Sequence, residues 1–89
     1  MMAKVKGVKP LDGHRLRLRF LDGAQGVVDV AASVGFTGVF ARLRDRDYFR
    51  KVRVDQEAGT ICWPNGADLD PDVLYWRATG KAPWKAKRR

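Results

Sequence analysis

The stretch that decides the fold class is HRLRLRF, residues 14–20. Apolar and basic residues alternate along it, Leu16, Leu18 and Phe20 against Arg15, Arg17 and Arg19. A period of two is typical of a β-strand with one buried face and one solvated face. The sequence therefore predicts a strand over residues 14–20 whose arginines point away from the core.

Turn signals on both sides of this strand extend it into a β-meander. Residues 3–9 form a first extended run, and the alternation slips at Gly7-Val8, which indicates a bulge. Pro10 to Gly13 reads as the turn that follows this run. Asp22-Gly23 is a second hairpin signal, typical of a type I′ turn. The run 24–30 is then expected to return as the third strand.

A second hairpin and short helices are expected in the middle of the chain. Residues 38–44 space their apolar side chains along one helical face, and Thr37 is a candidate N-cap. Asp45 or Asp47 is expected to start a further short turn. Residues 51–55 and 60–63 alternate as two strands that Pro64 ends, because proline cannot donate to a strand ladder.

The last helix carries start and stop signals at both ends. Asp70 is a favoured N-cap residue, Pro71 follows at the first helical position, and Gly80 is a natural C-terminal stop. The helix is therefore expected over residues 71–79. The fold class that follows is α+β, with a small, mostly antiparallel sheet of about five strands and two or three short helices. Residues 1–80 are expected to form one domain, followed by a basic, flexible tail over residues 81–89.

Composition excludes several classes of function. The chain has 89 residues, of which 45% are hydrophobic, and it contains one cysteine and one histidine. These numbers exclude a disulfide scaffold and a structural zinc site made from cysteine and histidine. No run approaches the roughly 18 apolar residues of a membrane span, and no apolar segment follows the basic start as in a secretory signal. A cytoplasmic protein without a membrane partner is the expectation.

The residues that could carry catalysis do not form a recognisable set. His14 and Ser33 lie in no local triad pattern, and Cys62 is flanked by residues expected to face the core, so we expect it to face the other way. Asp68, Asp70 and Asp72 have the spacing of a calcium loop, but its central glycine and closing glutamate are absent. No glycine-rich nucleotide motif occurs. We therefore expect no enzyme, no cofactor and no metal site.

Positive charge is the feature that composition leaves open. The formal net charge is +8, and residues 81–89 hold five bases and no acid. Basic stretches of this kind bind nucleic acid or an acidic protein, or they serve as a solubilising surface. A protein partner would be contacted by arginines and surplus tryptophans, Arg42, Arg46, Trp76 and Trp84. Nucleic acid would instead be contacted by a basic strand face and the tail, Arg15, Arg17, Arg19, Lys85, Lys87, Arg88 and Arg89.

Three runs carry a resemblance to a known family, VKGVKPLDGHRLRLRFLDGAQGVVDV (residues 5–30), GVFARLRDRDYFRKVRVD (38–55) and TICWPNGADLDPDVLY (60–75). They are similar to the bacterial domain-of-unknown-function 2442 family over about residues 3–76. The most specific part is WPNGADL, residues 63–69, followed by Leu74-Tyr75. Its physical reading is structural: Trp63 fills the core, Asn65-Gly66 makes a tight turn, and Asp68 accepts hydrogen bonds from that turn. A recognition role for this turn is the alternative.

The resemblance implies a small α+β fold and carries over no catalytic residue. Members of the family occur alone or joined to a helix-turn-helix domain, which is not part of this chain. Standalone members are often encoded beside a protein of the domain-of-unknown-function 4160 family, an arrangement like a toxin–antitoxin pair. The expectation is a non-enzymatic adaptor or regulator whose partner is another small protein. Nucleic-acid binding is the alternative, and the oligomeric state stays open.

Overall fold

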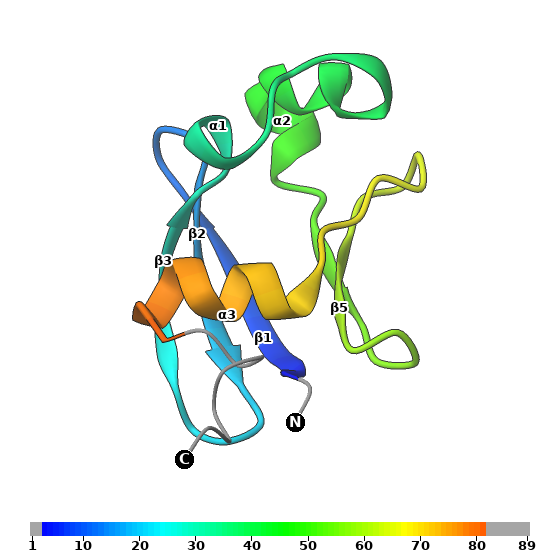
Figure 1. The fold of residues 1–89 in the computed structure, drawn as a ribbon. Coiled ribbons are helices and arrows are strands. Elements are labelled where there is room, and N and C mark those ends of the chain that lie inside the picture. Colours follow the sequence, from blue (N-terminus) through cyan, green and yellow to red (C-terminus); the bar gives the residue numbers. More distant parts are fainter. Residues whose placement is uncertain (1–2, 82–89) are drawn as a thin grey trace.

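The computed structural model describes residues 3–81, and it confirms an α+β fold with two antiparallel sheets. The larger sheet has the strand order β1-β2-β3, made of β1 (Val5–Leu11), β2 (Arg15–Phe20) and β3 (Gln25–Asp29). The smaller sheet is the hairpin of β4 (Arg53–Asp55) and β5 (Thr60–Cys62). The described helices are α1 (Val30–Ser33), the 3₁₀ helix η1 (Gly38–Arg44), α2 (Arg46–Phe49) and α3 (Pro71–Thr79). Figure 1 shows α3 crossing one face of the larger sheet.

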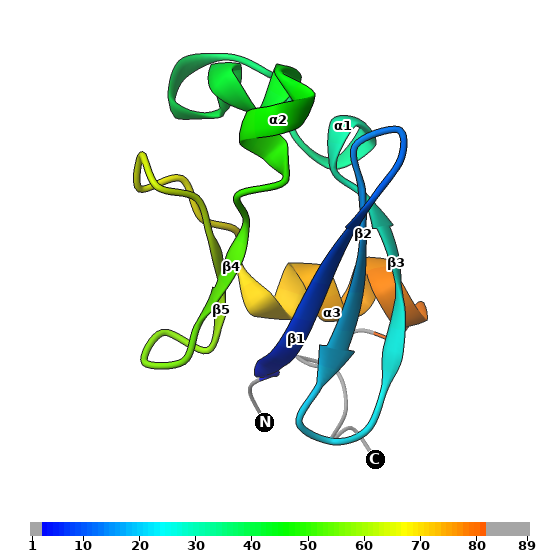
Figure 2. The same ribbon diagram turned by 180° about the vertical axis from the view of Figure 1, so that it is seen from behind.

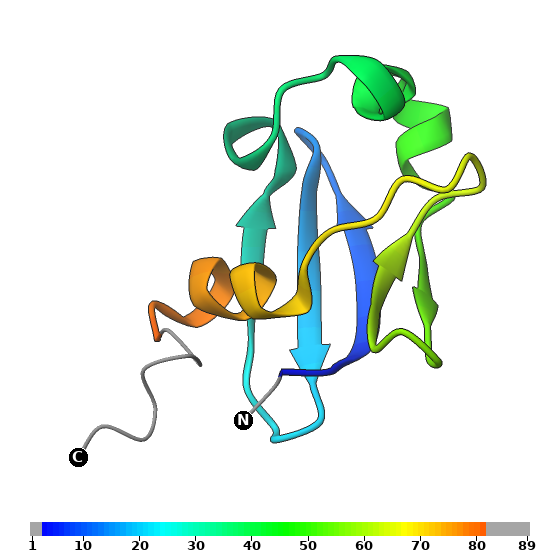
Figure 3. The same ribbon diagram turned by 45° about the vertical axis from the view of Figure 1, so that its right-hand side comes forward.

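The two faces of the larger sheet differ as the alternation predicts. The inner face, which α3 crosses, contains the buried residues Leu16, Leu18 and Phe20 of β2 and Val28 of β3. The core continues toward the β4–β5 hairpin through Trp63, which is 1% exposed. Figure 3 shows the hairpin beyond β1, at the opposite edge of the sheet from β3. One contiguous core therefore joins the two sheets and α3.

The first turn, not the second, has two consecutive left-handed residues. Gly13 and His14 have φ angles of 75° and 59°. At the second turn only Gly23 has a positive φ, so the type I′ prediction for Asp22-Gly23 is wrong. There the Asp22 side chain accepts a hydrogen bond from the Ala24 amide at 2.9 Å, which supports a different turn.

Strand β1 extends further than its sequence indicates. The bulge is confirmed, with a register shift between Val5 and Gly7, one residue before the predicted slip. The strand continues through Pro10 to Leu11, so the prediction that Pro10 belongs to the turn is wrong. Pro10 is tolerated because β1 is an edge strand and the missing N–H falls on its outward side.

The helix signals were informative to different degrees. The bounds of α3 are those predicted, with the Asp70 side chain accepting from the Asp72 amide at 2.8 Å and Gly80 left-handed at φ 80°. Thr37 holds the N-cap position of η1, but its side chain makes no capping bond. The role predicted for Asp68 is also wrong, because Asn65 Oδ1 accepts the hydrogen bond from the Ala67 amide at 3.1 Å. Within residues 3–81, no helix is long and apolar enough to cross a membrane.

Candidate functional site

The outer face of the larger sheet gathers the basic side chains of three strands, and we call it the basic sheet face. Arg15, Arg17 and Arg19 are exposed along β2. The pairing register places three rows side by side on this face, Leu11–Arg15–Asp29, Lys9–Arg17–Val27 and Gly7–Arg19–Gln25. Figure 2 looks onto this face, and no helix lies over it. The arrangement is a cationic surface with an apolar residue, Val27, at 37% exposure.

The charge of this face is not neutralised by neighbouring acids. Among residues 3–81 the structure contains one ion pair, a long 3.8 Å contact between Arg50 and Asp12. Asp29 is the acid in the rows, and its Oδ1 caps α1 by accepting from the Ala32 amide at 3.2 Å. Lys9, Arg17 and Arg19 therefore have no carboxylate partner within the described part of the chain. A surface of this kind attracts an anionic partner.

The basic sheet face also has a shallow hollow. A pocket of about 190 Å³ is lined by Gly7, Val8, Lys9, Arg17 and Arg19. The guanidinium of Arg19 lies against the β1 backbone, since a Cβ at Gly7 would stand 2.6 Å from Arg19 Nη2. A glycine at position 7 thus lets the guanidinium lie across the strand.

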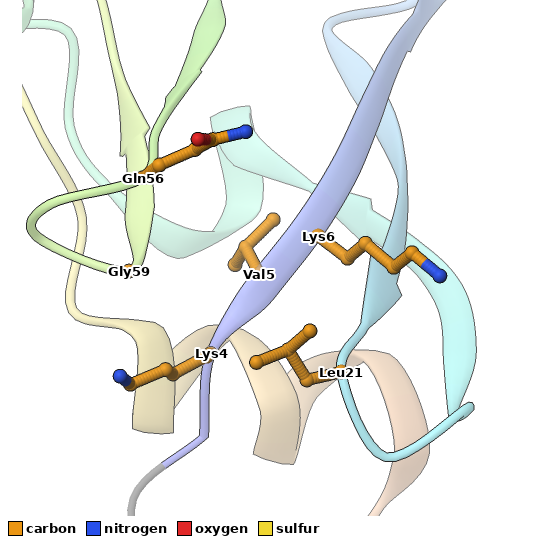
Figure 4. A pocket seen from close by; sticks show the side chains of 6 residues that line it. All are labelled: Lys4, Val5, Lys6, Leu21, Gln56 and Gly59. Atoms are coloured by element: carbon orange, nitrogen blue, oxygen red, sulfur yellow. The ribbon is translucent and has the colours of Figure 1, made fainter.

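A second pocket, of about 250 Å³, lies between the start of β1 and the β4–β5 turn. It is lined by Lys4, Val5, Lys6, Leu21, Gln56 and Gly59 (Figure 4). The side chains of Lys4 and Lys6 extend away from one another, so their ammonium groups do not converge on one point. The pocket lacks the converging polar groups that a small-anion site needs.

The residues predicted to contact a protein partner are spread over separate elements. Arg42 lies on η1 with its guanidinium 4.2 Å from the centroid of the Tyr48 ring, and Arg46 lies on the neighbouring α2. Trp76 is on α3, 42% exposed, with the Arg77 guanidinium 5.4 Å from its ring centroid. In Figure 1, α2 and α3 lie at different levels of the molecule. Five further predicted residues lie outside the described residues, Trp84, Lys85, Lys87, Arg88 and Arg89.

Of the predicted sets, the structure brings together Arg15, Arg17 and Arg19. The neighbours that complete their surface were not predicted from the sequence, and they are Gly7, Lys9 and Val27. The β1–β2 and β2–β3 hairpins carried the signal for these neighbours, because the register of a hairpin determines which residues face each other.

The groups considered for catalysis have structural partners. His14 Nε2 lies 3.0 Å from the Arg44 carbonyl oxygen, and its ring stands 5.1 Å from the ring centroids of both Phe36 and Phe49. These contacts attach the η1–α2 segment to the β1–β2 turn. Ser33 Oγ donates to the Asp29 carbonyl at 2.8 Å. Cys62 is half-buried in β5.

The described residues hold no group of three histidine, cysteine or acidic side chains that could bind a metal ion. Two of the three acids with calcium-loop spacing have backbone partners instead. Asp70 caps α3, and Asp72 Oδ1 accepts from the Ala3 amide at 2.8 Å.

One hydrogen bond between α3 and the β2–β3 turn joins the two side chains whose pKa values are shifted, Tyr75 and Asp22, and we call this pair the buttress. The Tyr75 hydroxyl donates to Asp22 Oδ2 at 2.6 Å. This bond lowers the pKa of the Asp22 carboxyl, with a smaller contribution from the Ala24 amide. The same bond raises the pKa of the Tyr75 hydroxyl, because ionisation would remove the donated proton, and desolvation and the Asp22 charge raise it further.

Tyr75→Phe is expected to lower stability in a pH-dependent way. The lowered pKa of Asp22 contributes stability above its unfolded value near 4, which is lost as pH falls through the folded value. The raised pKa of Tyr75 contributes stability below about pH 10, which is lost as pH rises further. The difference in unfolding free energy between Tyr75→Phe and the parent chain should therefore be largest between about pH 5 and 9. Urea titrations at a series of pH values measure this difference.

Tyr48→Phe is the matched control, because the Tyr48 hydroxyl has no carboxylate partner in residues 3–81. A constant difference between Tyr75→Phe and the parent from about pH 3 to pH 11 would contradict the assignment of the buttress.

The fold and the surface together define a small α+β domain with a cationic sheet face. The described residues of this domain contain no cluster that could bind a metal ion. The chain belongs to the family described as "Protein of unknown function (DUF2442)", whose model matches residues 5–80. This match confirms the resemblance drawn from the sequence. No curated protein and no solved structure matches the chain.

Proposed function

We propose that this protein is a non-enzymatic binding module, an adaptor or regulator that acts in the cytoplasm by contacting another protein through the basic sheet face. One observation carries the proposal: exposed cations without carboxylate partners stand beside an exposed valine on a face that no described helix covers. Arginine is enriched at protein interfaces, where its guanidinium binds carboxylates through two parallel hydrogen bonds.

The composition of the face favours a protein over a single-stranded nucleic acid. Proteins that bind single strands combine cations with aromatic side chains on which the bases stack. The three rows of the basic sheet face contain no aromatic residue. They contain Val27 and Leu11, which a protein partner can cover with apolar side chains.

Nucleic-acid binding is the second candidate, and the same unpaired arginines favour it. Phosphates on a duplex would be neutralised by Arg15, Arg17 and Arg19 without base stacking. This candidate makes a different prediction for salt. The logarithm of the binding constant would fall with the logarithm of salt concentration with a slope of about −0.9 per phosphate contacted.

The test is the double substitution Arg17→Glu, Arg19→Glu. The tagged chain is used to retain partners from its native cytoplasm at low and moderate salt, with and without nuclease. We expect one small protein to be retained at moderate salt after nuclease. Once that protein is purified, the double variant should bind it at least about tenfold more weakly, because two guanidinium–carboxylate contacts become repulsive.

The matched control is Lys51→Glu, Arg53→Glu, which changes the net charge equally at exposed positions outside the larger sheet. It should leave the affinity within about twofold of the parent if net charge alone is not responsible. Equal losses in the two variants would overturn the basic sheet face as the contact surface. Retention that disappears with nuclease would transfer the function to the second candidate.

A further inference from the structure

Strand β3 has an outward row of backbone groups without a partner among residues 3–81, except for the Asp29 carbonyl, which accepts from Ser33 Oγ. The Val30 amide donates to the His14 carbonyl at 3.0 Å, and the Phe20 amide donates to the Ala24 carbonyl at 2.9 Å. These bonds stand at the two ends of the β2–β3 ladder and fix its hydrogen-bonding phase. Since strand residues alternate in the direction of their N–H and C=O groups, the outward row belongs to Gln25, Val27 and Asp29.

The other edge of the sheet is protected by features that β3 lacks. Strand β1 has a bulge near Val5, and Pro10 removes an outward N–H. Its start is also bonded to the β4–β5 turn, since the Val5 amide donates to the Gly59 carbonyl at 2.9 Å. Bulges, prolines and covering segments are the means by which proteins prevent an edge strand from pairing. Residues 25–29 contain neither a proline nor a bulge.

Helix α3 packs against β3 without covering this edge. A Cβ at Gly26 would collide with the carbonyl oxygen of Ala78, so α3 lies directly on the inner face of the strand. In Figure 2 no strand lies beside the outer edge of β3, and the end of α3 reaches past this edge only behind the sheet, on its inner face. The edge and the basic sheet face are thus accessible from the same side of the molecule.

We infer that the free edge of β3 binds an extended segment of the partner protein as a fourth strand, and that this segment carries acidic residues at alternate positions. The inference rests on the proposed function and specifies its binding mode. An added strand would satisfy the outward N–H and C=O groups and cover Val27, as in other cases of strand addition.

Charge determines which residues the added strand carries. The side chains of the added strand on the basic sheet face would follow one another at every second residue, about 6.6–6.8 Å apart. This is also the spacing of Arg15, Arg17 and Arg19 along β2. The new strand would lie about 10 Å from β2, so a carboxylate side chain and an arginine could meet across β3. Acids are expected opposite Gln25 and Val27, in the rows of Arg19 and Arg17. They are not expected opposite Asp29, whose carboxylate would repel them.

The charge of this chain makes a second copy an unfavourable occupant. A second copy would bring its own formal charge of +8 and its own arginine row to the shared sheet. Pairing of two β3 edges would place the two arginine rows about 14 Å apart, and β3 offers one acid, Asp29, where the arginine rows favour two. The partner is therefore an acidic segment of a different protein.

The test uses Val27→Pro, with Val27→Thr as the matched control. Proline at position 27 removes an outward N–H and leaves the ladder to β2 intact, whereas threonine keeps the N–H. A displayed library of random short peptides is selected on the folded chain, and the tightest peptide is synthesised for titration. We expect acids at alternate positions, binding at least about tenfold weaker to Val27→Pro, and binding within about twofold for Val27→Thr.

A measurement on the unaltered chain makes the test independent of whether Val27→Pro folds. Backbone hydrogen exchange at Gln25, Val27 and Asp29 should slow when the peptide saturates the chain. Unchanged exchange at these amides, basic selected peptides, or equal affinity of the two variants would overturn the inference. So would a dimer in light scattering that Val27→Pro dissociates, because the occupant would then be a second copy.

The outcomes also separate this inference from the proposed function. A purified cytoplasmic partner that binds Val27→Pro normally but fails to bind the Arg17→Glu, Arg19→Glu variant supports the basic sheet face and overturns strand addition. Retention of no protein at all, or of nucleic acid alone, overturns both.

Discussion

Trp63→Ala is expected to cost about 3–5 kcal/mol of unfolding free energy, the usual range for removing a buried aromatic side chain. The Trp63 side chain is 1% exposed, and its ring centroid lies 5.9 Å from that of Phe49. Its Nε1 donates to the Phe49 carbonyl at 3.0 Å. At about 0.05–0.15 kcal/mol per residue, a chain of this length has roughly 4–13 kcal/mol in total. The substitution therefore removes a large share of the stability.

Urea unfolding followed by circular dichroism measures this loss, and Trp76→Ala is the control. Trp76 is 42% exposed on α3, so its removal should cost less than half as much. Equal costs for the two substitutions would contradict the assignment of Trp63 to the centre of the core. Trp63→Phe separates packing from hydrogen bonding, because it keeps an aromatic ring and loses the bond to Phe49.

The elements that the sequence predicted well are those with local causes. The alternation over residues 15–20 depends on side chains of one strand, and the bounds of α3 depend on Asp70, Pro71 and Gly80, which act within one turn of it. His14 shows the opposite case. Its φ of 59° accompanies a hydrogen bond to Arg44, thirty residues away, and ring contacts to Phe36 and Phe49. Local pattern contains no information about such partners.

The residues of the basic sheet face also divide into those that a local pattern predicts and those that depend on tertiary structure. Arg15, Arg17 and Arg19 were predicted to share a face because alternation is local. Lys9 and Val27 join them only through the pairing register, which depends on the true turn geometry and on the β1 bulge. The free edge of β3 was not predicted, since it depends on where the β4–β5 hairpin and α3 pack. The binding mode proposed for β3 is therefore a property of tertiary structure.

Gly26→Ala tests that tertiary arrangement directly, and we expect it to cost about 3 kcal/mol, the upper end of the usual cost of overpacking. The added methyl group would collide with the Ala78 carbonyl oxygen. Because this neighbour is backbone, it cannot rotate away, and α3 must separate from β3. Urea unfolding measures the loss.

Gly35→Ala is the control for this substitution, because the nearest atom to a Cβ there is Thr37 Oγ1 at 3.9 Å. It should be neutral or stabilise the chain by up to about 1 kcal/mol. If Gly26→Ala proved equally harmless, α3 would not be fixed on the inner face of β3. The helix could then reach the strand edge, and the reason for expecting an open edge beside the basic sheet face would be lost. A large loss for Gly26→Ala alone supports the arrangement in which α3 covers one face of β3 and leaves its outer edge accessible to a partner.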